Sequence, residues 1–253
     1  MKQILQKIIN VFGYKLIRLQ PAKPKKNSEK QQLLHTVFNN LLQAGFQPKH
    51  IIDIGANKGH WTREALRFFP NSKFTLIEPQ ERLKPHFQTL LDANANIRYK
   101  AVGVGKEAGS FAFTLHERDD SCSFRFTEEE AQQRGYQQIK IPVVTLASLA
   151  EDKTDWPRPD LIKIDAEGLD EEVIEGAGNL LGTAEVFLVE ATVNNLDMKN
   201  TVLRMMQLME KHGYRFYDIT DLNRPFAQEV LWLVEMAFIR KGDIVDHYTV
   251  PRT

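Results

Sequence analysis

The stretch HIIDIGANKG at positions 50–59 decides the fold of this chain. A short apolar run ends at Asp53-Ile54 and passes into a turn with two glycines, and apolar spacing predicts a helix over 61–69. In open α/β sheets, ligands bind where such strand-to-helix turns open, beside the helix N-terminus. Gly55 would let the backbone approach a ligand, and Gly59 would let the helix start pack closely. The stretch therefore predicts a strand, a ligand-binding turn and a helix.

The same alternation continues along the chain. Strand patterns occupy 73–78, 97–102, 110–115, 139–144, 160–165, 185–190, 214–219 and 230–239, and helical patterns occupy 28–44, 81–91, a segment from 170, and 198–212. Strands that alternate with helices indicate a largely parallel, doubly wound sheet covered on both faces. A short turn near 223–225 joins the last two strands, which predicts an antiparallel hairpin at one edge. We expect residues 28–253 to form one α/β domain.

Composition excludes several classes of protein. The chain has 253 residues, equal numbers of basic and acidic side chains (33 each) and one cysteine. This length can bury a full core, and zero net charge gives no reason to expect a nucleic-acid partner. Cys122 alone cannot form an intramolecular disulfide, and no apolar run approaches the ~20 residues that span a bilayer. These features predict a cytoplasmic protein.

The first 27 residues differ from the rest. Residues 1–30 hold eight Lys or Arg and one acid, and Ile4, Ile8 and Phe12 recur at helical spacing before the linker PAKPKKN at 21–27. Two interpretations are open for this N-terminal helical extension. Residues 1–26 could form a basic amphipathic helix on an anionic membrane surface. They could instead pack on their own domain or on the other subunit of a homodimer.

The turn at 53–59 also discriminates between nucleotide ligands. A dinucleotide site uses G-x-G-x-x-G so that backbone amides can hold a diphosphate, but Asn57 stands at the second glycine position. Asp53 would disfavour a diphosphate and would suit a cation, such as the ammonium and sulfonium of S-adenosylmethionine. Glu78 ends the second strand and can accept hydrogen bonds from ribose hydroxyls in either kind of site. The electrostatics therefore favour S-adenosylmethionine.

A second motif, LIKIDAEG, lies at 161–168. Asp165 leaves a buried strand at the same edge of the sheet as Asp53 and Glu78, and Glu167 follows two residues later. A carboxylate here could accept a proton from a substrate hydroxyl or orient that hydroxyl. In an equally favoured alternative, Glu167 caps the following helix and only Asp165 touches a ligand.

These motifs together resemble one known family. IIDIGANKGHWT at 51–62, IEP at 77–79, AVG at 101–103, TL at 145–146 and LIKIDAEGLDEEVIEGA at 161–177 are similar to FkbM-type methyltransferases, over about residues 48–192. The resemblance implies a Rossmann-like class I methyltransferase sheet with an antiparallel final strand. It also implies that S-adenosylmethionine is used to methylate a hydroxyl of a sugar or natural product, so we expect a small-molecule or glycan acceptor.

The resemblance also implies roles for individual positions. Asp53, Gly55, Asn57 and Gly59 would line the methionine end of the cofactor, Glu78 would hold the ribose, Ala101 and Val102 would flank the adenine, and Asp165 and Glu167 would stand near the transferred methyl. His116, in a polar stretch expected to face the substrate, is a further candidate base. Ala147 follows TL where the family commonly has an acid, so any role of that acid on the substrate side is absent here.

Three alternatives stay open. Asp165, Glu190 and Asp119–Asp120 could hold Mg²⁺ through oxygen ligands, although a metal is not expected. The chain could also be a non-catalytic binding or scaffold protein that keeps the methyltransferase fold. An NAD-dependent oxidoreductase is disfavoured by Asn57 and Asp53.

Overall fold

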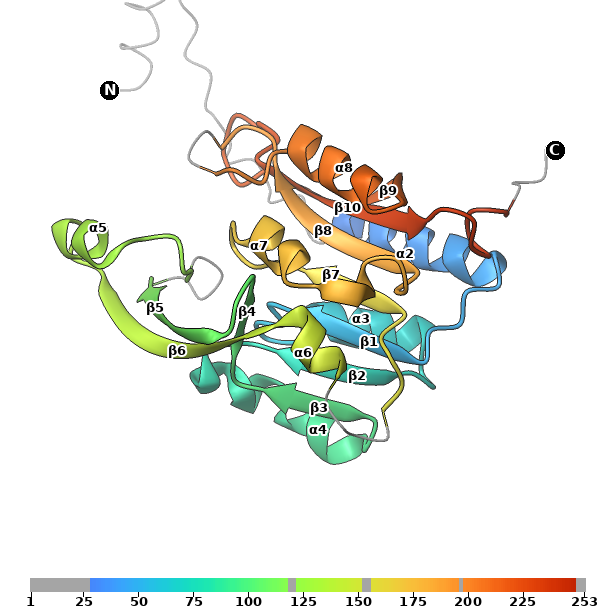
Figure 1. Ribbon diagram of the computed structural model, residues 1–253, viewed down its shortest axis with the longest axis horizontal. Helices are drawn as coiled ribbons and strands as arrows, with labels where there is room; N and C mark the ends of the chain where they lie inside the picture. Colours follow the sequence, from blue (N-terminus) through green and yellow to red (C-terminus); the bar gives the residue numbers. More distant parts are fainter. Residues whose placement is uncertain (1–27, 118–121, 152–155, 196–197, 249–253) are drawn as a thin grey trace, which may run out of the picture.

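The computed structural model describes residues 28–117, 122–151, 156–195 and 198–248 (Figure 1). The basic segment 1–27 lies outside these residues, so both of its interpretations stay predictions. Within the described ranges, no helix combines the length and apolarity needed to cross a membrane.

The main sheet has seven strands. Their spatial order is β3 (Ile97–Lys100), β2 (Lys73–Ile77), β1 (His50–Ile54), β7 (Leu161–Ile164), β8 (Val186–Thr192), β10 (Leu233–Arg240) and β9 (Tyr214–Asn223). All neighbouring strands are parallel except β10, which is antiparallel to both β8 and β9. The predicted antiparallel hairpin at one edge is confirmed. The order reverses between β1 and β7, and at such a switch point the two strand ends open a crevice.

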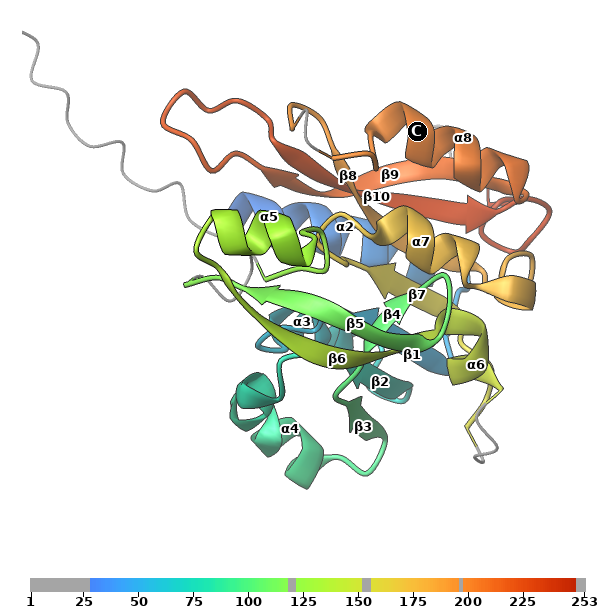
Figure 2. The ribbon, with the colours of Figure 1, turned by 60° about the vertical axis from the view of Figure 1, so that its left-hand side comes forward.

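Helices cover both faces of this sheet, as Figures 1 and 2 show. One face carries α2 (Ser28–Gln43), α3 (His60–Phe68), the 3₁₀ helix η1 (Glu81–His86) and α4 (Gln88–Ala93); the other carries α6 (Leu146–Ala150), α7 (Asp170–Glu175), the 3₁₀ helix η3 (Gly178–Leu180) and α8 (Val202–Lys211). Successive strand residues point to opposite faces. Ile51 therefore joins the core under α2 and α3, whereas Ile52 joins the core under α7 and α8.

A small second sheet was not foreseen from the sequence. It has the order β4 (Gly103–Gly105), β6 (Gln137–Thr145) and β5 (Gly109–Leu115), and α5 (Glu128–Gln133) lies on the loop between β5 and β6. The predicted strand 97–102 ends at Lys100, and the chain leaves the main sheet to enter β4. Gly103 permits this crossing, because a Cβ there would lie 2.6 Å from the ring of Phe124.

Other element bounds also moved from their predicted positions. The helix expected over 81–91 is divided into η1 and α4, with Pro85 in the final turn of η1. The helix expected from 198 begins at Val202, because Thr201 caps it through a hydrogen bond from the amide of Arg204. The last strand begins at Leu233 rather than at 230.

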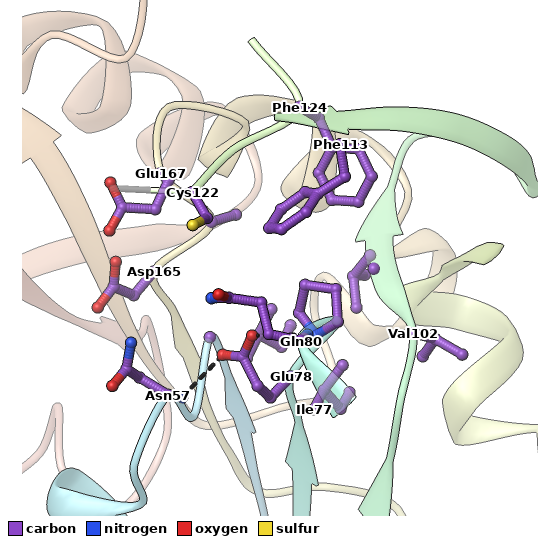
Figure 3. Close-up of a pocket in the computed structure, with 16 residues that line it drawn as sticks. Asn57, Ile77, Glu78, Gln80, Val102, Phe113, Cys122, Phe124, Asp165 and Glu167 are labelled. Atoms are coloured by element: carbon purple, nitrogen blue, oxygen red, sulfur yellow. Dashed lines mark hydrogen bonds between the residues drawn. The ribbon is translucent and has the colours of Figure 1, made fainter. Parts of the chain in front are cut away.

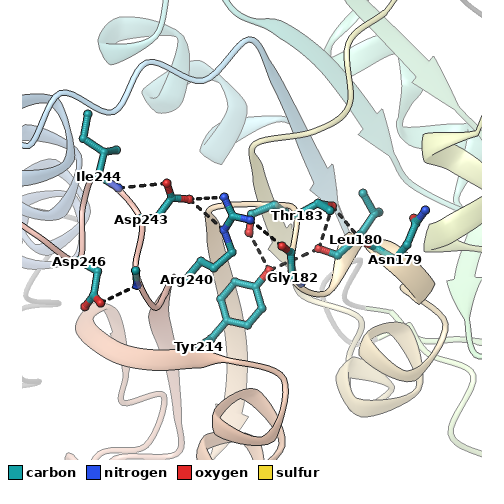
Figure 4. A network of polar contacts seen from close by, with 11 residues as sticks. Asn179, Leu180, Gly182, Thr183, Tyr214, Arg240, Asp243, Ile244 and Asp246 are labelled. Atoms are coloured by element: carbon teal, nitrogen blue, oxygen red, sulfur yellow. Dashed lines mark hydrogen bonds and ion pairs between the residues drawn. The ribbon is translucent and has the colours of Figure 1, made fainter.

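Polar contacts fix the C-terminal hairpin at the amino end of β8 (Figure 4). The Arg240 guanidinium donates to the carbonyl of Gly182 at 2.6 Å and to the carboxylate of Asp243. The Tyr214 hydroxyl donates to the carbonyl of Ala184 at 2.7 Å and accepts from the amide of Gly182. The start of β9 and the end of β10 are thereby held to the loop that precedes β8.

His50, at the start of β1, is buried in its neutral form. One ring nitrogen, Nδ1, lies 2.8 Å from the carbonyl of Pro157, and Nε2 lies 2.8 Å from Oγ1 of Thr75. Because Thr75 Oγ1 accepts from Arg98 Nε, its own proton is available to Nε2. Burial is the main cause that lowers the pKa of His50 to about 4.

This burial predicts a loss of stability in acid. An unfolded histidine takes up a proton near pH 6.5, whereas folded His50 resists protonation until about pH 4. Its contribution, up to about 3 kcal/mol, is therefore complete above pH 6.5 and is lost as the pH falls to 4. Urea unfolding at pH 7.5 and 4.5 would measure this effect. His50→Asn should show a smaller decrease between the two pH values, and an equal decrease in both proteins would contradict the assignment.

Candidate active site

An open cavity lies at the carboxyl ends of β1, β2 and β7, under the small sheet (Figure 3). It holds about 630 Å³ of empty space. Most of its wall comes from the turn after β1, the end of β2, the segment 102–104 and the turn after β7. Phe113, Cys122 and Phe124 close it from the side of the small sheet.

The turn after β1 forms part of the cavity floor. Gly55 has a φ of +73°, and a Cβ there would lie 2.0 Å from the backbone oxygen of Asp165. Only glycine fits, because the ends of β1 and β7 approach too closely for a side chain. Asn57 follows in the left-handed region at φ 45°, which asparagine tolerates better than most residues.

Glu78 is held in the middle of the cavity wall. Its Oε2 accepts the amide N–H of Asn57 and its Oε1 accepts that of Gln80, both at 2.9 Å. Each carboxylate oxygen has a further lone pair, so two vicinal hydroxyls could still donate to it. Burial raises the pKa of Glu78 above its usual value, and the two amides oppose that shift. Glu78, which the sequence analysis expected to hold a ribose, thus lies in the cavity wall.

Asp165, Ala166 and Glu167 line the other side of the cavity. Figure 3 shows the carboxylates of Asp165 and Glu167 together at one end, with Glu78 between them and Val102. The N-cap position of α7 is Leu169, and the alternative in which the Glu167 side chain caps this helix stays a prediction. Glu167 lies in the turn before the helix, at φ 52°.

Asp53 is fully buried and does not line the cavity. Thr62 Oγ1 donates to its Oδ2 at 2.5 Å, and Lys163 Nζ lies 3.5 Å from its Oδ1. The same Nζ donates to Oδ2 of Asp165 at 3.1 Å. Asp53 is therefore connected to the cavity wall through Lys163 and Asp165, rather than by direct contact as the resemblance implied.

Lys163 was missed by the sequence reasoning, although a lysine in the apolar strand LIKI is a usable signal. Burial by itself would lower the pKa of Lys163, but the facing carboxylates of Asp165 and Asp53 raise it above the usual value. Burial also raises the pKa of Asp53, which Lys163 opposes. On β10, burial raises the pKa of Glu235 to about 7. One ammonium group thus balances several acids at the carboxyl ends of the strands.

Three other predicted residues lie away from the cavity. Gly59 starts α3 at φ 72°, where a Cβ would meet Arg63 and Phe87. Ala101 is not part of the wall, whereas its neighbour Val102 is. The ring of His116 packs against Tyr136, with centroids 4.4 Å apart, rather than against the cavity.

The apolar wall was also missed. Phe113 and Phe124 pack with ring centroids 4.7 Å apart, and Cys122 is buried beside them. These residues reach the cavity only because the small sheet folds over it, and local sequence carries no signal for that placement.

No three His, Cys, Asp or Glu side chains among the described residues are arranged to hold a metal ion. Asp119 and Asp120, which the Mg²⁺ alternative needs, lie outside these residues.

The arrangement fits the chemistry of S-adenosylmethionine. Asp165 and Glu167 can face a cationic end, Glu78 can accept from a ribose, and Val102 and Phe124 offer apolar surface to a planar ring. A diphosphate would meet carboxylates along the same path, which is unfavourable. The sulfonium compound therefore matches the cavity better than a dinucleotide.

The chain is similar to known methyltransferases. It is 23% identical to Methyltransferase 1 of Beauveria bassiana over 181 residues, which are 65% of this chain and 71% of that protein. A solved FkbM methyltransferase from Methylobacillus flagellatus matches 74% of this chain with a TM-score of 0.49 and 14% identity, and this chain spans 43% of that protein's length. A third similar protein is an N1-methyltransferase of Burkholderia thailandensis that was solved with 1,6-didemethyltoxoflavin and S-adenosylhomocysteine. The match covers 84% of this chain and 77% of that protein's chain, with a TM-score of 0.46 and 13% identity.

The family described as the methyltransferase FkbM domain matches residues 53–216, well over half of the chain. This range contains every residue that lines the cavity. The protein belongs to the FkbM methyltransferase family.

Proposed function

We propose that this protein transfers a methyl group from S-adenosylmethionine to a hydroxyl oxygen of a sugar or natural-product small molecule. The observation that carries the proposal is the placement of Glu78. Two backbone amides hold its carboxylate in the cavity that Asp165 and Glu167 also line. A ribose acceptor and two acids for the reacting end thus face one cavity.

The two acids differ in their surroundings, which suggests different roles. Lys163 holds the carboxylate of Asp165 through a 3.1 Å contact, so Asp165 suits the fixed task of placing the cationic end of the cofactor. Glu167 lies two residues further along the turn, and its carboxylate can accept the proton of the acceptor hydroxyl. The cofactor, when bound, supplies an activated methyl group and the leaving group. Alignment and charge placement are then the tasks of the chain.

Titration calorimetry tests the cofactor. We expect the protein to bind S-adenosylmethionine and S-adenosylhomocysteine but not NAD. Glu78→Ala should weaken both by about 1.5–3 kcal/mol, because each ribose hydroxyl would lose a charged acceptor. Glu81→Ala is the matched control, since Glu81 lies on η1 outside the cavity wall. Equal affinities for the Glu78→Ala variant and the unaltered protein would refute the assignment of the ribose site.

The acceptor is tested with cofactor that carries a radiolabelled methyl group. Incubation with fractions of cell extract, followed by mass analysis of the labelled product, identifies the methylated species. An ether formed on a hydroxyl keeps its label in mild alkali, whereas a carboxyl ester releases it. Label on nitrogen or in an ester would refute the assignment of O-methylation to a hydroxyl. Cofactor binding without any transfer would favour the binding-protein alternative.

A further inference from the structure

The turn that carries Asp165 and Glu167 has an unusual backbone. Glu167 and Gly168 are consecutive left-handed residues, with φ of 52° and 96°. Glycine adopts this conformation freely, but a residue with a side chain pays about 1–2 kcal/mol for it. A backbone with this strain persists only where surrounding contacts hold it. Glu167 lines the cavity, so those contacts also fix where its carboxylate lies.

Asp170 supplies those contacts. It is completely buried, and its Oδ1 accepts the amide N–H of Ala166 at 3.0 Å. Its Oδ2 accepts the amide N–H of Gly168 at 3.2 Å. The two amides lie on either side of Glu167, so one carboxylate fixes the backbone both before and after that residue.

Asn200 connects this arrangement to β8. The Nδ2 of this fully buried residue donates to Oδ2 of Asp170 at 2.8 Å. Its backbone carbonyl accepts the amide N–H of Thr192, the last residue of β8, at 2.9 Å. The turn is therefore held through two side chains to a central strand of the sheet rather than by its own residues alone.

We propose that Asp170 is a positioning residue that directs the carboxylates of Asp165 and Glu167 at the reacting end of the cavity. The inference rests on the proposed function, because it assigns the methyl end of the cofactor to these two acids. Asp170 touches neither cofactor nor acceptor, since it is not part of the cavity wall. Its effect passes through the two amides that it binds.

The decisive variant combines Asp170→Asn with Asn200→Asp. It keeps the charge and the hydrogen bond between the two side chains, so the domain should fold. An asparagine at 170 has one acceptor oxygen instead of two, and one of the two turn amides therefore loses its acceptor. The single variant Asp170→Asn is measured alongside the double variant. The control is Glu171→Gln, because Glu171 lies on the same helix but pairs with Arg204 instead of the turn.

The readouts are the melting temperature and the ratio of affinities for S-adenosylmethionine and S-adenosylhomocysteine. These two compounds differ only in the methyl group and the positive charge that Asp165 and Glu167 are proposed to face. Measurements at pH 8.5 keep Asp170 ionised, since burial raises its pKa to about 7 against the opposing effect of the Ala166 amide. We expect both Asp170 variants to lower the ratio about tenfold, as loss of a bond to a charged group would. In the double variant the melting temperature should return close to that of the unaltered protein.

The outcomes separate this inference from the proposed function. A restored melting temperature with a lowered ratio supports a positioning role. If the ratio of affinities is unchanged in the double variant, Asp170 has only a structural role. That result overturns the inference about Asp170 but leaves the proposed function standing. If the unaltered protein binds neither compound, the proposed function fails and the inference fails with it.

Discussion

Gly55→Ala should abolish cofactor binding and destabilise the domain by about 3 kcal/mol or more. The added Cβ would lie 2.0 Å from the backbone oxygen of Asp165, and neither strand end can move without breaking the sheet. The positive φ of +73° adds the cost of a left-handed alanine. Calorimetry with S-adenosylmethionine and urea unfolding measure the two effects.

Gly182→Ala is the matched control for this substitution. Gly182 also has a positive φ, +95°, but nothing lies within 4 Å of the added Cβ. It should cost about 1 kcal/mol from backbone strain alone and leave cofactor binding unchanged. If the two variants were equally stable, the close approach of β1 and β7 at the cavity floor would be disproved.

Lys163→Met should cost about 3–5 kcal/mol of folding free energy at pH 8. The substitution keeps the apolar stem but leaves Asp53 buried without its cation, and an unpaired buried charge is strongly destabilising. It also removes the contact that holds Asp165, so the affinity for S-adenosylmethionine should fall. Urea unfolding and calorimetry would measure the two losses separately.

Two further variants test the cause of this destabilisation. Lys140→Met removes an ion pair with Glu128 whose partners are both largely exposed, and it should change stability by less than about 1 kcal/mol. Asp53→Leu combined with Lys163→Met removes both charges and should regain part of the stability lost in the single variant. A double variant less stable than Lys163→Met would show that the unpaired Asp53 is not the cause.

Local sequence was sufficient to predict the strands of the main sheet and part of the site. The period of the apolar residues predicted the strands of the main sheet, and the acids and glycines at strand ends predicted the edge that holds the cavity. Gly55, Asn57, Glu78, Asp165 and Glu167, with Val102, do line it. These residues follow β1, β2 and β7 or the end of β3 closely, so the parallel topology alone brings them together.

The direction of a side chain was harder to predict from the sequence than the position of its residue in the fold. Asp53 lies at the expected strand end, but its side chain points into the layer under α3, where Thr62 binds it. It is connected to the cavity wall only indirectly, through Lys163 and Asp165. A residue one position earlier or later along a strand faces the opposite side of the sheet. The sequence motif contains this alternation, but it does not say which face meets the ligand.

The sequence by itself determined the strands of the main sheet, the family and the acids and glycines at the open edge, because these depend on local periodicity and on short motifs. Only the tertiary structure decided which residues close the cavity and which hold its acids. Phe113 and Phe124 come from the small sheet, and Asn200 reaches Asp170 across 30 positions of sequence. Such contacts are set by how distant segments pack, and no local pattern encodes the distance between them.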